Sequence, residues 1–502
     1  MKLKDLLVDL VLRQQIQLSG MGNLSITGLA LNSDKVKVGN LFIALAGSKQ
    51  HGLIYTKQAM ELGAVAVIYD PLGGGKEIAQ ELDNLPVFAV NDLSAYLGEI
   101  AARYYAYPSE SLAVIGITGT NGKTSCSQFL GQVLDDCGVI GTLGWGQWGA
   151  LNKTINTTPD ALEVQRILAG LRKDKKQLVA MEVSSHGLVQ GRVNAVNFIG
   201  AVFTNISRDH LDYHGSMEAY LEAKLLLLTK PGLRFVVVNL DDDYSEQVIK
   251  AVPKGVLIWG VTAKGSKVSE VETLNISEIL HKSAGLEFEV SFRGQSYGVE
   301  VPIYGDFNVE NISIVLAVML ALGIDIVTAI KKIQGLHPVI GRMEHWGGND
   351  QPLIFVDYAH TPDALKKVLL SLRKHCQYAL WVVFGCGGNR DKGKRSEMGQ
   401  IAQELADYVI VTDDNPRFED SSMIVTDILQ GCNSLSRLNK VVEVIQNREQ
   451  AIKTAINKAT QFDCILIAGK GHEDYQEIEG LRIPFSDSQV VKQALEARII
   501  SI

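Results

Sequence analysis

A glycine-rich segment in the first third of the chain has the residue types needed to bind nucleotide phosphates. It reads Gly116-Ile-Thr-Gly-Thr-Asn-Gly-Lys-Thr-Ser125 and separates a continuous apolar run from a helix-like stretch at 127–134. Glycines allow backbone N–H groups to close around phosphate oxygens, and the N-terminus of a following helix adds its dipole. Lys123 is suited to reach the terminal phosphates, and the Thr124 hydroxyl to ligate Mg²⁺.

The spacing of this loop departs from the common G-x-x-x-x-G-K-[ST] pattern. Five residues lie between Gly116 and Gly122, and two lie between Gly119 and Gly122. The alternative interpretation is a glycine-rich turn with a solvated lysine. The order of strand, turn, Lys-Thr and helix favours a nucleotide phosphate site, but it does not indicate which reaction the site serves.

Three further side chains could act beside the phosphates. Glu182 lies in an apolar run at 177–183 and is a hard oxygen ligand suited to Mg²⁺. His210 follows another such run; alone it would more often be structural, but the strand-end position that it shares with Glu182 favours a second ligand or a phosphate contact. Lys224 lies in a helix-like stretch, where its surroundings alone predict only a solvated lysine.

Continuous apolar runs predict the strands that position these groups. In the middle of the chain they cover 112–117, 177–183, 198–205 and 235–240. Runs that are apolar on both faces are typical of a parallel sheet covered by helices. We therefore predict a nucleotide-binding α/β domain over 111–337.

A further series of strands is predicted over 338–502. Four buried runs cover 353–356, 380–384, 408–411 and 464–468, and each ends in a polar or glycine-rich loop. Open parallel sheets bind ligands outside the carboxyl ends of their strands. We therefore expect the four loops to share one rim.

Residues 1–110 are predicted to form a small α/β unit. Short apolar runs at 41–45, 64–69 and 87–90 alternate with helix-like stretches, and Pro108 marks a boundary because proline disfavours helix at the residue before it. The first ten residues carry charges within their apolar stretch, which predicts a surface helix rather than a secretory signal.

Composition excludes several classes of protein. The 502 residues suggest roughly three domains, and 46% hydrophobic with 21% charged residues is typical of a globular rather than a disordered chain. A net charge of −8 argues against non-specific binding to nucleic acid or anionic membrane. The six cysteines form no C-x-x-C pair, which indicates free thiols, and no apolar run is long enough for a membrane span. We expect a soluble, cytoplasmic monomer.

Taken together, these motifs resemble the Mur ligase family over nearly the whole chain. The resemblance implies three α/β domains: a UDP-sugar-binding domain at 1–110, a central P-loop-type ATPase domain at 111–337, and a C-terminal Rossmann-like domain at 338–502 that binds the incoming amino acid and part of ATP. The matching segments are Gly119-Thr-Asn-Gly-Lys-Thr124, Asn156-Thr-Thr158, Met181-Glu-Val-Ser-Ser-His-Gly-Leu-Val-Gln190 with Arg192, Asp209-His-Leu-Asp-Tyr-His214, Gly341-Arg-Met-Glu344, Asp357-Tyr-Ala-His-Thr-Pro-Asp363 and Asp414-Asn-Pro-Arg417.

The activity implied by this resemblance is ATP-dependent amide formation in peptidoglycan precursor synthesis. The D-glutamyl γ-carboxylate of UDP-N-acetylmuramoyl-L-alanyl-D-glutamate would attack the ATP γ-phosphate and form an acyl phosphate. The amine of a diamino acid would then displace phosphate. Because two anions must approach each other, neutralisation of their charge is the expected main catalytic device.

The resemblance also assigns catalytic, metal and nucleotide residues. Lys123 would act with Mg²⁺ held by Thr124, Glu182, His210 and Lys224, the last as N6-carboxylysine. Carbamylation gives lysine the oxygen ligands that Mg²⁺ prefers, and burial favours the neutral amine that reacts with CO₂. The ATP-binding residues implied, with Asp357 suited to the ribose hydroxyls, are Gly119, Thr120, Asn121, Gly122, Lys123, Thr124, Ser125, Asn308, Arg342 and Asp357.

Contacts to the nucleotide-sugar acceptor follow from the same comparison. Asn32-Ser33-Asp34 stands where Asp-Ser-Arg is usual in the family, so the uridine side departs from the expected pattern. Ordinary loop polarity is the alternative for Ser48, Lys49 and Gln50. The residues implied are Asn156, Thr157, Thr158, Ser184, Gln190 and Arg192 for the muramoyl dipeptide, and Leu31, Ser33, Ser48, Lys49 and Gln50 for the uridine end.

The amino acid to be added is indicated by the segment 414–417. Meso-diaminopimelate differs from L-lysine by a second carboxylate, which the planar guanidinium of Arg417 can bind bidentately. Lysine-adding relatives usually lack this arginine, so diaminopimelate is favoured and L-lysine remains the alternative. The residues implied are Arg390, Asp414, Asn415, Pro416, Arg417, Gly469 and Glu473, with Asp414 and Glu473 taking the distal ammonium.

Two other functions are considered. Folylpolyglutamate synthases have similar ATPase parts, but the segments 156–158 and 414–417 count against them. A nucleotide-binding scaffold without turnover would be indicated by loss of Lys123, Glu182 or Lys224, and all three are present.

Overall fold

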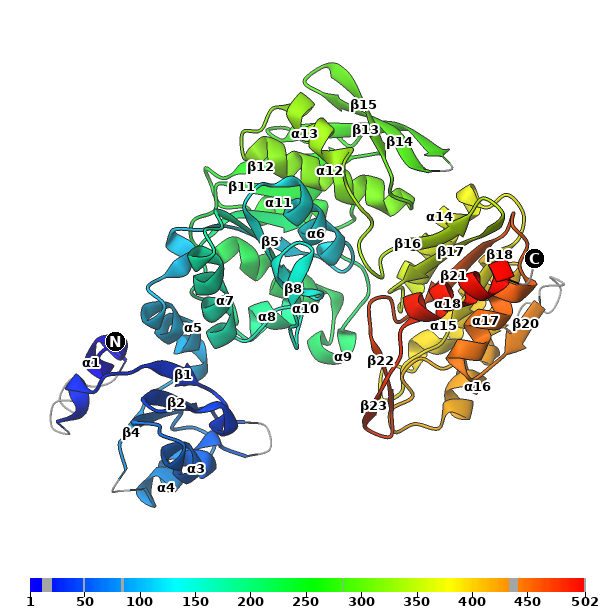
Figure 1. Ribbon diagram of the computed structural model, residues 1–502. Coiled ribbons are helices and arrows are strands. Elements are labelled where there is room, and N and C mark those ends of the chain that lie inside the picture. Colours follow the sequence, from blue (N-terminus) through cyan, green and yellow to red (C-terminus); the bar gives the residue numbers. More distant parts are fainter. Residues whose placement is uncertain (11–19, 48–49, 83–84, 283, 433–440, 501–502) are drawn as a thin grey trace. The chain divides into compact units, whose positions relative to one another are not determined.

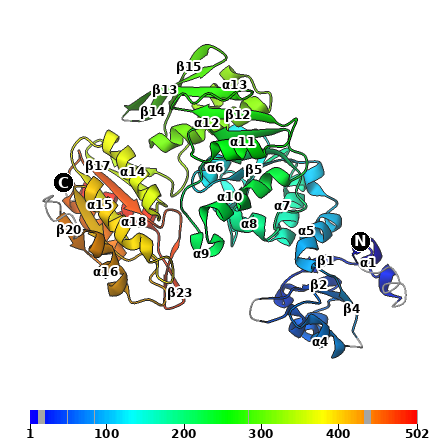
Figure 2. The ribbon, with the colours of Figure 1, turned by 180° about the vertical axis from the view of Figure 1, so that it is seen from behind.

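The computed structural model describes residues 1–10, 20–47, 50–82, 85–282, 284–432 and 441–500 (Figures 1 and 2). The chain forms two compact units. Unit 1 comprises 1–118, 136–201 and 222–234, and unit 2 comprises 119–135, 202–221 and 235–502. Boundaries between the units fall inside strand β10 (Phe198–Phe203) and helix α10 (Met217–Leu225). The three-domain division at 110 and 337 stays a prediction.

The first part of unit 1 is a four-stranded parallel sheet. Its strands lie in the order β1 (Gly28–Ala30), β2 (Asn40–Ala44), β3 (Ala66–Tyr69) and β4 (Val87–Ala89), with helices α3 (Thr56–Glu61), α4 (Gly75–Gln80) and α5 (Leu93–Tyr104). Alternate residues of β2 enter two separate apolar clusters, one with Leu41 and the other with Phe42. The three apolar runs predicted here are therefore confirmed as strands.

The expected surface helix at the N-terminus is confirmed, although it is short. Helix α1 (Leu3–Leu6) is a single turn, and Leu3 and Leu6 are fully buried in the cluster around Leu41. Lys4 and Asp5, which lie between these leucines, are exposed, so the helix lies at the surface with its apolar face packed inward.

A second group of unit 1 strands is centred on β9 (Leu178–Glu182), which has a strand on each side. Strands β5 (Ala113–Thr118) and β6 (Cys137–Gly141) pair with β9 in parallel, and the antiparallel strands β7 (Gly144–Gln147) and β8 (Ala150–Asn152) continue from β6. The helices are α7 (Ala161–Lys173) and α8 (Ser185–Val189). The strand ending at Glu182 is buried almost throughout, as its continuous apolar sequence predicts.

Unit 2 contains helix α6 (Lys123–Val133), which begins four residues earlier than the predicted stretch at 127–134. Strands β11 (Phe235–Asn239), β12 (Leu257–Thr262) and β13 (Glu272–Lys282) are parallel. Strands β14 (Gly285–Phe292) and β15 (Gln295–Val301) then pair antiparallel, as β7 and β8 do, so these strands depart from the parallel pairing that the apolar runs indicate. Alternating burial along β14 explains the difference. The remaining helices are α9 (Leu211–His214), α11 (Ser245–Ala251), α12 (Asp306–Ala321) and α13 (Ile326–Ile333).

The last part of unit 2 is a six-stranded sheet whose strands lie in the order β16, β17, β21, β18, β19, β20. All pair in parallel except β16, and the four strands predicted from apolar runs are confirmed as β17, β18, β19 and β21. The bounds are β16 (Glu344–Gly348), β17 (Gln351–Asp357), β18 (Leu380–Phe384), β19 (Tyr408–Val411), β20 (Val441–Val444) and β21 (Cys464–Ala468).

Helices cover both faces of this sheet (Figures 1 and 2). Helices α14 (Pro362–His375), α15 (Gly393–Leu405) and α16 (Ser421–Cys432) pack against one face, and α17 (Arg448–Lys458) and α18 (Asp487–Ile500) against the other. The hairpin of β22 (Tyr475–Ile478) and β23 (Leu481–Pro484) follows β21. This arrangement leaves the strand ends as the place for a polar site.

A buried ion pair joins the first residues of α17 and α18. Arg448 Nε and NH2 lie 2.7 and 2.8 Å from the two Asp487 oxygens, and both side chains are fully buried. We predict that Arg448→Met lowers the free energy of unfolding by ~3–5 kcal/mol, because Asp487 is left as an unpaired buried charge. Urea titration followed by circular dichroism measures the change.

The matched control is Arg293→Met. Arg293 pairs with Glu272 at the surface, where the two side chains are 67% and 44% exposed. Its loss is expected to cost ~0–1 kcal/mol. Equal shifts of the urea midpoint in the two variants would contradict the prediction.

Candidate active site

The predicted phosphate loop is held in a conformation that only glycine allows at two positions. Gly119 and Gly122 have φ of +146° and +86°. A Cβ at Gly119 would lie 1.9 Å from Thr204 Oγ1, and one at Gly122 would lie 2.4 Å from Asn311 Oδ1. Neighbouring backbone also fixes the loop, since Thr120 N donates to Asn205 O at 2.7 Å. The loop is therefore preformed at the start of α6.

The two chemical groups of this loop, Lys123 and Thr124, lie in the first turn of α6. Lys123 is the first residue of α6, and its Nζ donates to the carbonyls of Gly119 and Thr120 at 2.8 Å each. Thr124 follows and is buried, with Arg342 NH2 3.4 Å from its hydroxyl. The ammonium of Lys123 therefore lies against the loop, close to the place where a bound phosphate would sit.

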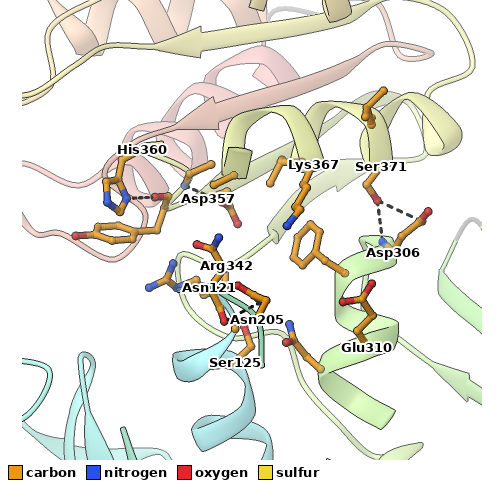
Figure 3. A pocket seen from close by; sticks show the side chains of 18 of the residues that line it. Asn121, Ser125, Asn205, Asp306, Glu310, Arg342, Asp357, His360, Lys367 and Ser371 are labelled. Carbon is orange, nitrogen blue, oxygen red and sulfur yellow. Dashed lines mark hydrogen bonds between the residues drawn. The ribbon is translucent and has the colours of Figure 1, made fainter. Parts of the chain in front are cut away.

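A cavity of about 450 Å³ adjoins this loop (Figure 3). Five of the predicted nucleotide residues line it: Asn121, Gly122, Ser125, Arg342 and Asp357. In Figure 3, Arg342, Asp357 and His360 lie on one side, and Asp306, Glu310, Lys367 and Ser371 lie on the other. The cavity therefore offers charged groups of both signs beside a phosphate loop.

Asp357 is positioned by its backbone surroundings. Its oxygens accept hydrogen bonds from Met343 N and Ala359 N, both at 2.8 Å. Burial raises the pKa of this carboxyl, and the nearby charge of Arg342 opposes that shift. The Arg342 guanidinium lies over the Tyr358 ring, 4.5 Å from its centroid, and its buried Nε has no hydrogen-bond partner among the described residues. That donor is available to a ligand.

Asn308 lies differently from the other predicted nucleotide residues. It is buried, its Nδ2 donates to Tyr304 O at 2.7 Å, and its Oδ1 accepts from Asn311 Nδ2 at 3.0 Å. It does not line the cavity, whereas Asn311 does. In this structure Asn308 orders the first turns of α12.

A second cavity, of about 490 Å³, lies at the carboxyl ends of β17, β18, β19 and β21. All four strand-end loops contribute to it, which confirms that they share one rim. Except for Pro416, every residue predicted for the amino acid lines this cavity, and so does His210: Arg390, Asp414, Asn415, Arg417, Gly469, Glu473 and His210.

The second cavity contains charged groups of both signs. Arg417 has a φ of +54°, its NH1 donates to Gly388 O at 2.9 Å, and its Nε lies 3.4 Å from Glu477 Oε2. Asn415 Nδ2 donates to Glu473 Oε2 at 2.9 Å. Arginines and carboxylates in one cavity match an amino acid that carries both a carboxylate and an ammonium.

The two cavities share Tyr358 and His360. His360 Nδ1 lies 2.8 Å from Tyr358 O, and burial lowers the pKa of this imidazole to about 4, so it is neutral at physiological pH. Lys394 Nζ donates to His360 O at 2.7 Å. The sequence predicts no role for His360 or Lys394, although the strand-end position of His360 is a usable signal.

Several residues predicted for the nucleotide-sugar acceptor lie together in unit 1. Thr158 Oγ1 donates to Glu182 O at 3.0 Å and lies 3.1 Å from Ser184 Oγ. Arg192 NH1 donates to Thr158 O at 2.6 Å, and its Nε donates to Gln190 Oε1 at 3.0 Å. One polar network therefore joins four of the predicted residues.

The other predicted acceptor residues are more scattered. Thr157 Oγ1 lies 3.0 Å from Thr142 Oγ1, and Asn156 is exposed. Near the first sheet, Ser33 is buried and Leu31 is half-buried. Gln50 is exposed, and its side-chain amide donates a hydrogen bond to the Tyr55 hydroxyl. Ser48 and Lys49 lie outside the described residues.

Glu182 is the best-defined of the predicted metal ligands. It is fully buried, and its two oxygens accept from Thr142 N at 2.9 Å and Thr142 Oγ1 at 3.0 Å. A Cβ at Gly141 would lie 2.0 Å from Glu182 Oε1, so this glycine makes room for the carboxylate. Lys224 on α10 is also buried.

The donor chemistry of the predicted metal set suits Mg²⁺. Glu182 and Thr124 supply hard oxygen atoms, and a carbamate on Lys224 would supply more. Across the part of the chain that the structure describes, no group of three or more histidine, cysteine, aspartate or glutamate side chains is gathered as a metal site. The predicted set does not need such a group, because two of its members are threonine and lysine.

Comparisons with known proteins identify the class. Family models match at 25–105 (Mur ligase family, catalytic domain), 117–319 (Mur ligase middle domain) and 341–471 (Mur ligase, glutamate ligase domain). The chain belongs to the Mur ligase family, and it has the α/β architecture with three Mur ligase domains that its sequence predicts.

Individual relatives show which members of the Mur ligase family this chain is similar to. The chain is 45% identical to the UDP-N-acetylmuramoyl-L-alanyl-D-glutamate--2,6-diaminopimelate ligase of Pseudomonas aeruginosa, over 95% of this chain and 96% of the relative. It is 43% identical to the protein of that name from Alkalilimnicola ehrlichii, over 97% and 98%.

Solved structures agree with this placement. A structure of a ligase with the same name covers 99% of both chains, with a TM-score of 0.70 and 35% identity. Mycobacterium tuberculosis folylpolyglutamate synthase complexed with ADP shares the fold at 18% identity and a TM-score of 0.62, over 75% of this chain and 92% of that one.

The described residues contain no helix suited to crossing a membrane, because none is both long enough and apolar enough.

Proposed function

We propose that this chain is an ATP-dependent ligase that adds meso-2,6-diaminopimelate to the D-glutamyl γ-carboxylate of UDP-N-acetylmuramoyl-L-alanyl-D-glutamate. The reaction serves peptidoglycan precursor synthesis in the cytoplasm. One observation carries the proposal: the second cavity brings Arg390 and Arg417 together with Asp414 and Glu473. The name shared by the relatives supports the same substrates.

The arrangement of groups supports a reaction in two stages. ATP binds in the first cavity, with its phosphates at the loop that contains Lys123 and its ribose at Asp357. The lysine charge reduces repulsion between the triphosphate and the acceptor carboxylate. Thr124, Glu182, His210 and a carbamate on Lys224 would hold Mg²⁺, which would supply further positive charge.

The second cavity then supplies the nucleophile. Arg417 binds the distal carboxylate of diaminopimelate, and Asp414 and Glu473 bind the distal ammonium, which leaves the other amine to attack the acyl phosphate. Because Tyr358 and His360 border both cavities, the loop that carries them lies where the amino acid and the nucleotide converge. Neutral His360 adds no charge beside the incoming amine.

Two alternatives are less well supported. L-lysine has no distal carboxylate, so the donors of Arg417 would have no partner on this substrate. Unpaired donors in a binding site weaken binding. A folylpolyglutamate synthase is supported by fold alone, at 18% identity.

The deciding experiment is a coupled assay of ADP release. It contains UDP-muramoyl dipeptide, Mg-ATP, bicarbonate and either meso-diaminopimelate or L-lysine. We expect release that depends on both the acceptor and diaminopimelate, with formation of the UDP-muramoyl tripeptide. Turnover with L-lysine but not diaminopimelate would overturn the specificity. Failure of every combination would overturn the ligase itself.

Lys224 provides a test of the proposed carbamate. Lys224→Ala is expected to lower kcat by about 100-fold or more, because an oxygen ligand for the metal is lost. Wild-type enzyme incubated with ¹³C-bicarbonate should show a carbamate carbon resonance that is missing from the variant. The control is Lys230→Ala, which removes a half-buried lysine that donates a hydrogen bond to Asn194 Oδ1 at 2.8 Å. A fully active variant without the resonance would contradict the assignment.

A further inference from the structure

Lys470 is a buried cation next to the second cavity. It lies two residues after the end of β21, and its side chain is fully buried. An ammonium removed from water is costly unless paired charges and hydrogen bonds replace its hydration. The partners of this lysine therefore indicate why it is there.

Those partners are residues already proposed to hold the amino acid. Lys470 Nζ donates to Asn415 Oδ1 and to Glu473 Oε2, both at 3.0 Å, and lies 3.6 Å from Asp414 Oδ1. An ammonium has three donor hydrogens, so it can serve all three acceptors. Through them it ties the loop after β19 to the loop after β21.

The charge balance of the cluster defines what it can bind. Asp414 and Glu473 are two carboxylates beside one lysine, and Arg448, close by, is satisfied by Asp487. Two carboxylates without a cation would repel each other. The charge of Lys470 reduces that repulsion, and the three side chains together keep a net negative charge.

One acceptor in this cluster is not saturated. Asp414 Oδ1 is buried and accepts no hydrogen bond from the described residues, although it lies near Lys470 Nζ. Asp414 and Glu473 line the cavity, whereas Lys470 does not. The lysine thus acts on the carboxylates from the side away from the ligand.

We infer that Lys470 is a positioning residue that holds Asp414, Asn415 and Glu473 in place as the receptor for the distal ammonium of the incoming diamino acid. It does not touch the substrate. The inference rests on the proposed function, and it adds a specificity element behind the residues that contact the amino acid.

The test replaces the charge while keeping the volume. Lys470→Met is expected to raise KM for meso-diaminopimelate by about 30-fold, the effect of truncating one partner of a buried charge pair. The affinity for an ATP analogue and KM for the nucleotide-sugar acceptor should stay at wild-type values. The matched control is Lys453→Met, an exposed lysine on α17 paired with Glu449.

The split between KM and kcat separates this role from simple support of the fold. In Lys470→Met, kcat at saturating diaminopimelate is expected to stay near the wild-type value, because the reacting amine is not the group that Asp414 and Glu473 hold. An unchanged KM, or a loss that extends equally to kcat and to KM for the acceptor, would overturn the inference.

Two further comparisons make the result decisive. If Lys470→Met fails to bind the ATP analogue and is therefore misfolded, Lys470→Gln, which keeps a hydrogen-bond donor without charge, must show the same KM increase with kcat near the wild-type value. Wild-type enzyme is assayed in parallel. If wild-type enzyme does not use diaminopimelate, the proposed function fails, and that outcome is distinct from an insensitive Lys470 variant.

Discussion

Arg417→Ala is expected to lower kcat/KM for meso-diaminopimelate by about 10³-fold, within the range for loss of one partner of a buried charge pair. The side chain is held in the cavity by Gly388 O and Glu477. A guanidinium fixed in this way would present donors to the distal carboxylate without further loss of side-chain freedom. Its removal leaves that carboxylate without this cation in a cavity that also contains acidic groups.

The effect should be confined to the amino acid. Arg417 does not line the first cavity, so the affinity for an ATP analogue is expected to stay at the wild-type value. L-lysine, which lacks the carboxylate, should be used no worse by the variant than by wild type. The preference for diaminopimelate over lysine should therefore collapse, which a substrate panel measures directly.

Arg482→Ala is the matched control. Arg482 is exposed on β23 and stacks on Tyr475, 4.4 Å from the ring centroid, so it tests loss of a nearby arginine that does not line the cavity. Unchanged kcat/KM for diaminopimelate in Arg417→Ala, or an equal loss in both variants, would remove the specificity argument.

The strands can be predicted because a strand buried on both faces has a continuous run of apolar residues. Every continuous apolar run identified in the middle and last thirds of the chain forms a strand, and the rim formed by four loops follows from parallel pairing. The antiparallel pair β14–β15 is not predicted because its signal is alternation rather than a continuous run. The short hairpin β22–β23 is exposed or half-buried along its length and has neither signal.

The candidate site is only partly predictable for a different reason. Lys470 and Asn415 are 55 residues apart, and their contact exists only because β19 and β21 end at the same rim. A lysine after a strand gives no sequence signal of burial. Conversely, Asn308 has the residue type of a ligand contact, but its amide is bonded within its own helix region. Burial and pairing are tertiary properties, and single-residue patterns do not record them.

Lys123→Ala is expected to abolish most turnover, with kcat lowered by about 10³-fold. The ammonium lies over the phosphate loop, bonded to Gly119 O and Thr120 O. Without it, the repulsion between the triphosphate and the acceptor carboxylate is no longer reduced when the acyl phosphate forms. The loop itself should persist, because its glycines and the Thr120–Asn205 bond do not depend on the lysine.

The defect should lie in the first chemical stage. Hydroxylamine trapping of the acyl phosphate should yield product with wild-type enzyme and almost none with the variant, while an ATP analogue still binds. Lys250→Ala, which removes an exposed lysine paired with Glu246 on α11, should behave as wild type. Near-normal trapping in Lys123→Ala would show that the charge of this lysine is not what allows the two anions to meet. The activation step would then need another cation near the loop. Arg342, which lines the first cavity and lies 3.4 Å from the Thr124 hydroxyl, is the first to test.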